Sequence, residues 1–121
     1  MSAFDDLSAM QPLQIWDEVI ARSVTGGRLT LAVVELEPNS LVPEHRHDHE
    51  QLGIVLTGSL NFRVGEEARD LGPGGTWRIE SNAPHEVQVG PEGAVVIDVF
   101  APTRDDWESA KRLEPRTPRW P

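Results

Sequence analysis

The sequence contains no cysteine, which excludes disulfide bonds and thiolate metal ligands. No stretch of the chain is long and apolar enough for a membrane span or for the hydrophobic region of a signal peptide. Basic residues are outnumbered, because 11 Lys and Arg stand against 20 Asp and Glu and give a formal net charge of −9. An acidic protein is a poor partner for nucleic acid or for an anionic membrane, although local charge decides whether a small anion binds. We therefore expect a cytoplasmic protein that binds neither nucleic acid nor membranes.

The chain also lacks repeats and low-complexity segments, and its 121 residues indicate a single domain over residues 1–121. At this length about two-thirds of the surface of the unfolded chain is buried on folding. Hydrophobic residues make up 38% and charged residues 26% of the sequence, which is ordinary for a soluble globular protein. The chain can therefore form a hydrophobic core of its own.

Short apolar or alternating segments, separated by glycine and proline, follow one another through most of the chain. Alternating segments indicate half-buried β-strands, and the Gly- and Pro-rich clusters between them indicate turns. Many short strands at such close spacing predict an all-β sandwich or barrel. The predicted strands cover residues 29–36, 42–47, 51–56, 60–64, 76–79, 85–89 and 94–100, with further alternation within 13–24. The predicted turns lie at Gly26–Gly27, Gly58, Gly72–Gly75 and Gly90–Gly93.

The two ends of the chain depart from the strand pattern. Residues 1–10 indicate a loose N-terminal arm or a short turn of helix. Residues 105–113 have helical character, with Thr103 or Asp105 as the N-cap, and predict a short C-terminal helix. Residues 115–121 contain three prolines and indicate an extended tail that Trp120 would dock. The C-terminal helix and tail together span residues 103–121.

Three histidines occupy strand-like segments and are candidate metal ligands. His45 and His47 are two residues apart, so on an extended strand their side chains project from the same face. His85 follows Pro84 at the start of another alternating segment. Three imidazoles with one oxygen ligand would hold a divalent transition metal and leave coordination positions open. The alternative is that these are surface or turn-capping histidines.

Two neighbouring residues compete for the oxygen ligand. Gln51 begins the apolar run after the histidine pair, but its neutral amide is a weaker ligand than a carboxylate. Glu50 carries a carboxylate, but it would lie on the opposite face from His47 in a regular strand. His49 nominally shares the His47 face, yet it sits at a predicted kink near Asp48, and we expect it to be exposed.

Asp98 lies in an otherwise apolar segment, residues 94–100. A strand that is apolar on both sides is normally buried on both faces, and an ionised carboxylate there is costly unless it is paired or faces a polar cavity. Asp98 therefore either bridges to an arginine or points into the barrel mouth, and we favour the mouth. Tryptophan side chains are expected in the core or at an interface rather than on a ligand platform; they are Trp16, Trp77, Trp107 and Trp120.

This arrangement resembles the cupin superfamily, small barrels of the double-stranded β-helix or jelly-roll type that hold a metal in the barrel mouth. In the first cupin motif, Gly-x5-His-x-His-x3-4-Glu-x6-Gly, His45, His47 and Gly58 match, and Gln51 occupies the Glu slot. In the second motif, Gly-x5-Pro-x-Gly-x2-His-x3-Asn, His85 matches, as does Gly74. The remaining motif slots hold other residues: Asn39, Glu80, Asn82 and Val89. The resemblance covers residues 29–100 and implies a barrel core there.

The segment from Asp98 to Trp107, DVFAPTRDDW, resembles the Asp-Val-Phe-Ser-Pro-x-Arg-x-Asp-Phe ending of one cupin group. That group comprises bacterial enzymes that linearise 4,5-unsaturated monouronates in pectin and alginate breakdown. The resemblance implies that Asp98 is the catalytic aspartate and that Arg104 binds the substrate. Arg104 could instead be a surface residue paired with its acidic neighbours. The implied metal ligands are three histidines and a glutamine, here His45, His47, His85 and Gln51.

The implied function is conversion of an unsaturated monouronate to its linear keto form. A divalent metal such as zinc, nickel, manganese or iron would act as a Lewis acid. Arg104 would bind the anionic uronate carboxylate in a bidentate manner, and Asp98 would shuttle a proton. Two alternatives are a metal-dependent dioxygenase and a non-catalytic, metal-dependent binder of a small molecule. We also expect a homodimer, paired through sheet edges or exchanged N-terminal strands, because edge strands need covering.

Overall fold

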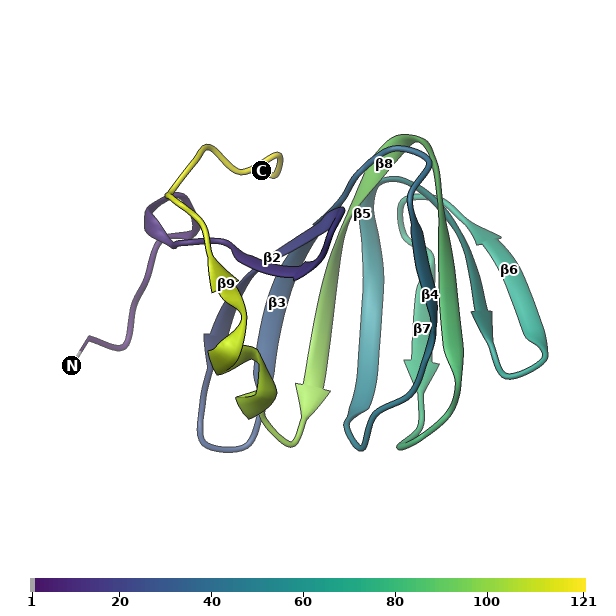
Figure 1. Ribbon diagram of the computed structural model, residues 1–121, viewed down its shortest axis with the longest axis horizontal. Helices are drawn as coiled ribbons and strands as arrows, with labels where there is room; N and C mark the ends of the chain where they lie inside the picture. The colour runs from purple at the N-terminus through teal and green to yellow at the C-terminus, as the bar shows by residue number, and fades with distance from the viewer. Residues whose placement is uncertain (1) are drawn as a thin grey trace.

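The computed structural model describes residues 2–121 and consists mainly of β-strands (Figure 1). Two short 3₁₀ helices, η1 (Leu7–Ala9) and η2 (Asp105–Ser109), lie outside the strands. No helix within residues 2–121 has the length and apolar character needed to cross a membrane. The predicted all-β fold is confirmed. The strands are β1 (Leu13–Trp16), β2 (Val19–Thr25), β3 (Thr30–Leu36), β4 (Leu41–His45), β5 (Glu50–Val64), β6 (Glu67–Leu71), β7 (Thr76–Ile79), β8 (His85–Ala101) and β9 (Lys111–Arg112).

Two long strands, β5 with 15 residues and β8 with 17 residues, organise the sheet. They pair antiparallel over most of their length, from Glu50 opposite Ala101 to Val64 opposite His85. Strands β3 and β4 pair with opposite ends of β8, while β7 and β6 pair with opposite ends of β5. Each long strand therefore contributes to both walls of the barrel, and Figure 1 shows β8 bending over at the top of the view.

Glycine marks the places where the long strands bend. The turns predicted at Gly26–Gly27 and Gly72–Gly75 are confirmed, since they separate β2 from β3 and β6 from β7. The turns predicted at Gly58 and Gly90–Gly93 are wrong, because β5 and β8 continue through them. Gly58 has a φ of +80°, and a Cβ there would lie 1.9 Å from the carbonyl oxygen of Gly93. Only glycine fits this close crossing, which explains why a bend within a strand has the sequence pattern of a turn.

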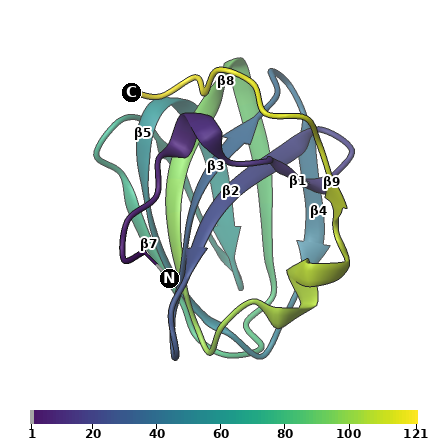
Figure 2. The ribbon, with the colours of Figure 1, turned by 90° about the vertical axis from the view of Figure 1, so that its left-hand side faces the viewer.

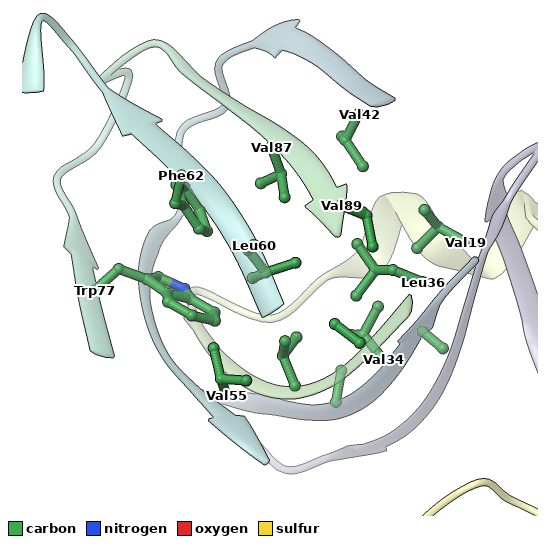
Figure 3. Close-up of a cluster of buried hydrophobic side chains, with 14 of the residues drawn as sticks. Val19, Val34, Leu36, Val42, Val55, Leu60, Phe62, Trp77, Val87 and Val89 are labelled. Atoms are coloured by element: carbon green, nitrogen blue, oxygen red, sulfur yellow. The ribbon is translucent and has the colours of Figure 1, made fainter. Parts of the chain in front are cut away.

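Apolar side chains from both walls fill the interior (Figure 3). The cluster includes Leu60 and Phe62 of β5 and Leu36 of β3. Trp77 packs against Phe62, with ring centroids 4.8 Å apart. A Cβ at Gly53 would lie 2.2 Å from the Trp77 ring, so the glycine makes room for the indole. This packing fixes Trp77, whose N–H group reaches the site described below.

The N-terminal arm matches its prediction, because η1 is the one regular element in residues 2–10. Asp6 caps η1 by accepting a hydrogen bond from the backbone N–H of Ser8 at 2.9 Å. Met1, the remaining residue of the predicted arm, lies outside the described residues.

The predicted helix over residues 105–113 is shorter than expected. It is the 3₁₀ helix η2, which ends at Ser109, and β9 follows it and pairs with β1 (Figure 2). Pairing in β9 requires an extended backbone, so the helix must end first. The predicted caps are also wrong, because the N-cap position is Arg104 and no side chain bonds there. The Thr103 hydroxyl instead donates to the Asp105 carboxylate at 2.7 Å.

Ion pairs and backbone hydrogen bonds anchor the C-terminal tail on β2 and β3. Arg22 pairs with Glu35, and both side chains are buried. The Arg22 Nη2 group donates to the carbonyl oxygen of Arg116 at 3.1 Å. The backbone N–H of Arg119 donates to Glu35 at 3.1 Å. Arginines therefore hold the extended tail, while Trp120 is only half-buried.

Candidate metal centre

Three histidines converge from two paired strands and one loop. His45 is the last residue of β4, and His85, the first residue of β8, lies directly opposite it. The strand predicted over residues 42–47 ends at His45, so a loop delivers His47 to the same side. The ligand atoms of the three rings all lie within 4.8 Å of one another. The structure therefore brings together every histidine selected by spacing.

Backbone carbonyls fix the orientation of all three imidazoles. A carbonyl oxygen can only accept a hydrogen bond, so each Nδ1 must carry the hydrogen and each Nε2 must offer a lone pair. The three rings thus turn their Nε2 atoms, each with a lone pair, toward one another. The Nδ1-to-oxygen distances are 2.9 Å from His45 to Pro43, 3.0 Å from His47 to His49 and 2.9 Å from His85 to Ala83.

Gln51 adds an oxygen to this cluster. Its Nε2 donates to Asp98 Oδ1 at 2.8 Å, which turns its Oε1 toward His47 Nε2 at 3.1 Å. Gln51 Oε1 is an acceptor, and so is His47 Nε2 when the hydrogen is on Nδ1, so no hydrogen bond forms between these two atoms. His85 Nε2 is buried and has no hydrogen-bond partner among residues 2–121. A cation satisfies all of these acceptors at once, and three imidazole nitrogens with one oxygen suit a divalent transition metal.

Burial favours the unprotonated form of two of the histidines, because it lowers the pKa of each. It lowers the pKa of His85 to about 4. Burial also lowers the pKa of His47, and the positive charge of Arg104 adds to the effect. Because a metal binds only the neutral imidazole, these shifts leave both lone pairs available.

Asp98 lies beside the histidine cluster and is 8% exposed. Its Oδ1 accepts hydrogen bonds from Gln51 Nε2 at 2.8 Å and from Trp77 Nε1 at 2.9 Å. Burial raises the pKa of Asp98 to about 6, although both hydrogen bonds oppose the shift. Among residues 2–121 no arginine forms an ion pair with Asp98. The structure thus places this carboxyl group at the cavity rather than in a structural ion pair.

Arg104 presents one edge of its guanidinium group to the cavity. Its Cζ lies 4.6 Å from the centroid of the Phe100 ring and 4.5 Å from that of the Trp107 ring. Its Nε and Nη2 donate to the two oxygens of Asp106 at 3.1 and 2.9 Å. Within residues 2–121 no acceptor bonds to Nη1, so the Nη1–Nη2 edge is left for a ligand. The ion pair with an acidic neighbour that was the alternative for Arg104 is therefore present, and the same residue lines the cavity.

One cavity of about 380 Å³ joins these groups. Its lining includes the three histidines together with Gln51, Asp98 and Arg104. The cavity thus brings together a cluster of metal-binding atoms, a buried carboxyl group with a raised pKa and a guanidinium edge. Such a combination can bind an anion and transfer a proton next to a metal.

Two residues near the cavity, His49 and Trp16, differ from their predicted environments. His49 was expected to be exposed, but its side chain is only 14% exposed because Nε2 lies 3.2 Å from the Thr103 carbonyl oxygen. Glu50, the alternative oxygen ligand, is exposed at the start of β5 and is not part of the histidine cluster. Trp16 is 36% exposed and lines the cavity, whereas all four tryptophans were expected in the core or at an interface.

Sequence reasoning could not have placed Trp16. The pairing of β1 with β2 shifts register between Gln14 and Trp16, and no residue type in this stretch indicates such a bulge. Asp106 also lines the cavity. Its role next to Arg104 was foreseen only as a possible ion pair, because sequence distance alone does not tell which edge of a guanidinium is occupied.

The comparisons with known proteins agree with this architecture. A family model described as "Cupin domain" matches residues 32–100. The pectin degradation protein KdgF of Dickeya dadantii (strain 3937) is 32% identical over 80 residues, which are 65% of this chain and 73% of that protein. The structure of KdgF from Halomonas sp. matches with a TM-score of 0.80 at 22% identity, over 88% of this chain and 98% of that one.

A further structure, an RmlC-like cupin from Shewanella frigidimarina NCIMB 400, matches with a TM-score of 0.81 at 19% identity. That match covers 88% of this chain and 96% of the other. At such identities the two structural matches support the fold alone. The family match, the barrel built on β5 and β8 and the histidine cluster at its cavity agree, and the chain belongs to the cupin family.

Proposed function

We propose that this protein is a metal-dependent enzyme that converts a 4,5-unsaturated monouronate into its linear keto form. One observation carries the proposal: three convergent imidazole nitrogens, a buried carboxyl group and a guanidinium group line the same cavity. The similarity to a pectin degradation protein supports a uronate as the substrate. The predicted cytoplasmic location stays a prediction.

The proposed metal site consists of His45, His47, His85 and Gln51. When bound there, a divalent ion such as zinc, nickel, manganese or iron supplies a Lewis acid for an oxygen of the substrate. The convergent histidine nitrogens and the amide oxygen of Gln51 near His47 favour binding of such an ion. The reaction changes no oxidation state, so several of these metals could serve.

Arg104 is proposed to bind and orient the carboxylate of the substrate. Its Nη1–Nη2 edge matches the two oxygens of a carboxylate in a planar, bidentate pair. Phe100 and Trp107 hold the guanidinium plane, and Asp106 occupies its other edge. Little conformational freedom is therefore left to lose when the anion binds.

Asp98 is proposed to carry the proton that the isomerisation needs. The anomeric hydroxyl of the substrate loses a proton, the C1–ring-oxygen bond breaks, and a proton is added at C4, which leaves a ketone at C5. The product is an isomer of the substrate, so no oxidant or reductant is required. Hydrogen bonds from Gln51 and Trp77 hold Oδ1 in place and leave Oδ2 for the substrate. A carboxyl group with a pKa of about 6 can both give and accept a proton near neutral pH.

An ultraviolet assay tests this proposal. Metal-loaded protein is incubated with 4,5-unsaturated galacturonate, and the loss of double-bond absorbance is compared with the spontaneous rate. We expect acceleration that chelation or Asp98→Asn abolishes and that Asp5→Asn, a change to an exposed carboxylate on the N-terminal arm, leaves intact. No acceleration by protein with measured bound metal would refute the uronate activity. Oxygen consumption would then support the dioxygenase alternative, and binding without turnover would support the binder.

We also propose that the protein is a homodimer. A row of apolar residues crosses the outer face of the sheet, because Val24 lies opposite Leu31, and Val99 lies opposite both Leu31 and Leu52. Leu31 and Leu52 are 42% and 46% exposed, and a second copy of the same face would cover them. Sedimentation velocity of the wild type, Leu52→Glu and the control Leu41→Glu tests this, since Leu41 is 52% exposed on β4. A monomeric wild type refutes the dimer.

A further inference from the structure

Trp16 is the large apolar residue at the cavity that remains substantially exposed. It is 36% exposed, whereas Trp77 and Trp107, which also line the cavity, are 7% and 8% exposed. An indole placed against water at a concave site gains free energy when a flat apolar surface covers it. The exposed ring therefore indicates a contact that the folded chain does not itself provide.

Ring contacts place Trp16 next to the histidine cluster. Its ring centroid lies 5.3 Å from that of His45, and His45 lies 5.8 Å from His47. His47 in turn lies 6.0 Å from Phe100, which carries the Arg104 guanidinium on its face. Trp16 and Arg104 thus stand at the two ends of a series of contacts that has the candidate metal ligands between them.

A purely structural role for Trp16 would be to orient His45. The geometry does not require it, because the Nδ1 of His45 is already fixed by the Pro43 carbonyl oxygen at 2.9 Å. Pairing with His85 across β4 and β8 fixes the backbone of His45 as well. The planes of Trp16 and His45 cross at 57°, so the indole is not stacked flat on the imidazole. Because Trp16 and the histidines line the same cavity, a ligand bound next to the histidines can reach the indole.

We propose that Trp16 is the stacking surface for the sugar ring of the substrate and that it selects the cyclic form over open-chain acids. The inference rests on the proposed function. In an unsaturated uronate, the C4–C5 double bond flattens one side of the ring, and a flat ring suits an indole face. While Arg104 holds the carboxylate, Trp16 contacts the ring beyond the metal site. The linear product has no ring to stack, so it loses this contact and leaves the cavity more readily.

Calorimetry on metal-loaded protein tests the selection without catalysis. The probes are D-galacturonate, which is cyclic and does not react, and L-galactonate, the open-chain acid that results when C1 of D-galacturonate is reduced. We expect the wild type to bind the cyclic acid more tightly and Trp16→Ala to lose about tenfold in affinity for it alone. Trp16→Phe should keep most of the preference. Phe4→Ala, which removes an aromatic residue that is 86% exposed on the N-terminal arm, is the matched control.

Kinetics and metal analysis complete the test. With unsaturated galacturonate, Trp16→Ala should raise KM about tenfold and change kcat little, and its metal content should equal that of the wild type. An unchanged preference in Trp16→Ala overturns the stacking role. Equal losses of affinity for both probes, together with a lower metal content, also overturn the stacking role, since that result would mean that Trp16 positions His45. A wild type that lacks turnover but shows a Trp16-dependent ring preference refutes the enzyme and retains the stacking site.

Discussion

The two sides of the cavity are held in place in different ways. On the histidine side, each ring is fixed by a backbone carbonyl, and His45 and His85 lie on paired strands. On the C-terminal side, other side chains hold Arg104, namely Phe100, Trp107 and Asp106. The backbone N–H of Arg104 donates to the Thr30 hydroxyl of β3 at 2.9 Å, and further along the segment β9 pairs with β1.

The two sides are proposed to differ in role as well: the histidine side binds the metal, and the C-terminal side selects the substrate. Backbone carbonyls remain when neighbouring side chains change, so the orientation of the rings is insensitive to sequence variation around them. Arg104 depends on three side chains, and a change to any of them alters the edge that it offers. We therefore expect substitutions on the C-terminal side to change affinity for the substrate while the metal stays bound.

The largest expected effect comes from removing one histidine. His85→Ala takes away a buried Nε2 that has no other partner among the described residues. We expect the affinity for zinc to fall by more than about a thousandfold, or about 4 kcal/mol. Competition with a chelating dye measures the dissociation constant, and circular dichroism checks the fold.

His49→Ala is the control for that variant. His49 is half-buried and close to the cluster, but it is not among the three converging residues. The His49→Ala variant should bind zinc as tightly as the wild type does. Equal losses in the two variants would mean that the site extends beyond the three histidines, and a full zinc site in His85→Ala would remove His85 from it.

Much of the barrel could be predicted from the sequence because its strands alternate in polarity between Gly- and Pro-rich turns. The failures at Gly58 and Gly90–Gly93 have a local cause. Glycine there permits two continuous strands to cross closely, because Gly58 and Gly93 adopt positive φ. A turn also requires glycine at positive φ, so the sequence does not distinguish the two cases. The end of the C-terminal helix at Ser109 could not be foreseen, because it depends on the distant pairing of β9 with β1.

The candidate site was predictable to the extent that it depends on spacing and burial. The interval between His45 and His47, and a carboxyl group at Asp98 within an apolar strand, were sufficient to select those residues. Trp16 and Asp106 depend instead on a register shift and on the geometry of one ion pair. Both are tertiary features that a single sequence does not encode locally.

A second prediction concerns Asp98 in the metal-free protein. Burial raises its pKa from 3.8 in the unfolded chain to about 6 in the folded chain. The folded state therefore favours the protonated form, and this stabilisation is complete below about pH 4 and is lost as the pH rises through 6. Asp98→Asn does not titrate, so its stability relative to the wild type should rise by up to about 3 kcal/mol between pH 4 and 7.

Urea unfolding of chelated samples at several pH values measures this difference. The two proteins share every other titratable group, so the contributions of those groups cancel in the comparison. A difference that does not change with pH would mean that Asp98 is not buried as a carboxyl group. The result would then place Asp98 on the solvent-exposed part of the cavity.

A third, smaller effect is expected at Arg104. Arg104→Lys keeps the charge but loses the planar edge and the contact with two aromatic rings. We expect KM for the unsaturated uronate to rise about tenfold, which corresponds to about 1.4 kcal/mol, with the zinc affinity unchanged. Arg69→Lys, at a site that is 67% exposed on β6, should change neither quantity. A loss of zinc from Arg104→Lys would contradict the separation of the two sides.

The smallest effect is expected from the tail that follows β9. Arg119 is 40% exposed, and its side chain pairs with Glu37 at 2.7 Å. Arg119→Ala removes this exposed pair and the longer contacts of the side chain with Glu35 at 3.7 Å and the Leu36 carbonyl oxygen at 3.4 Å, but it keeps the backbone N–H that donates to Glu35. Because water screens such a pair, the free energy of unfolding should fall by less than about 1 kcal/mol. KM should not change, since β9 and the ring contacts of Arg104 hold the cavity without the Arg119 side chain. If Arg119→Ala raises KM, the tail also positions Arg104, and the C-terminal side of the cavity extends to the end of the described chain.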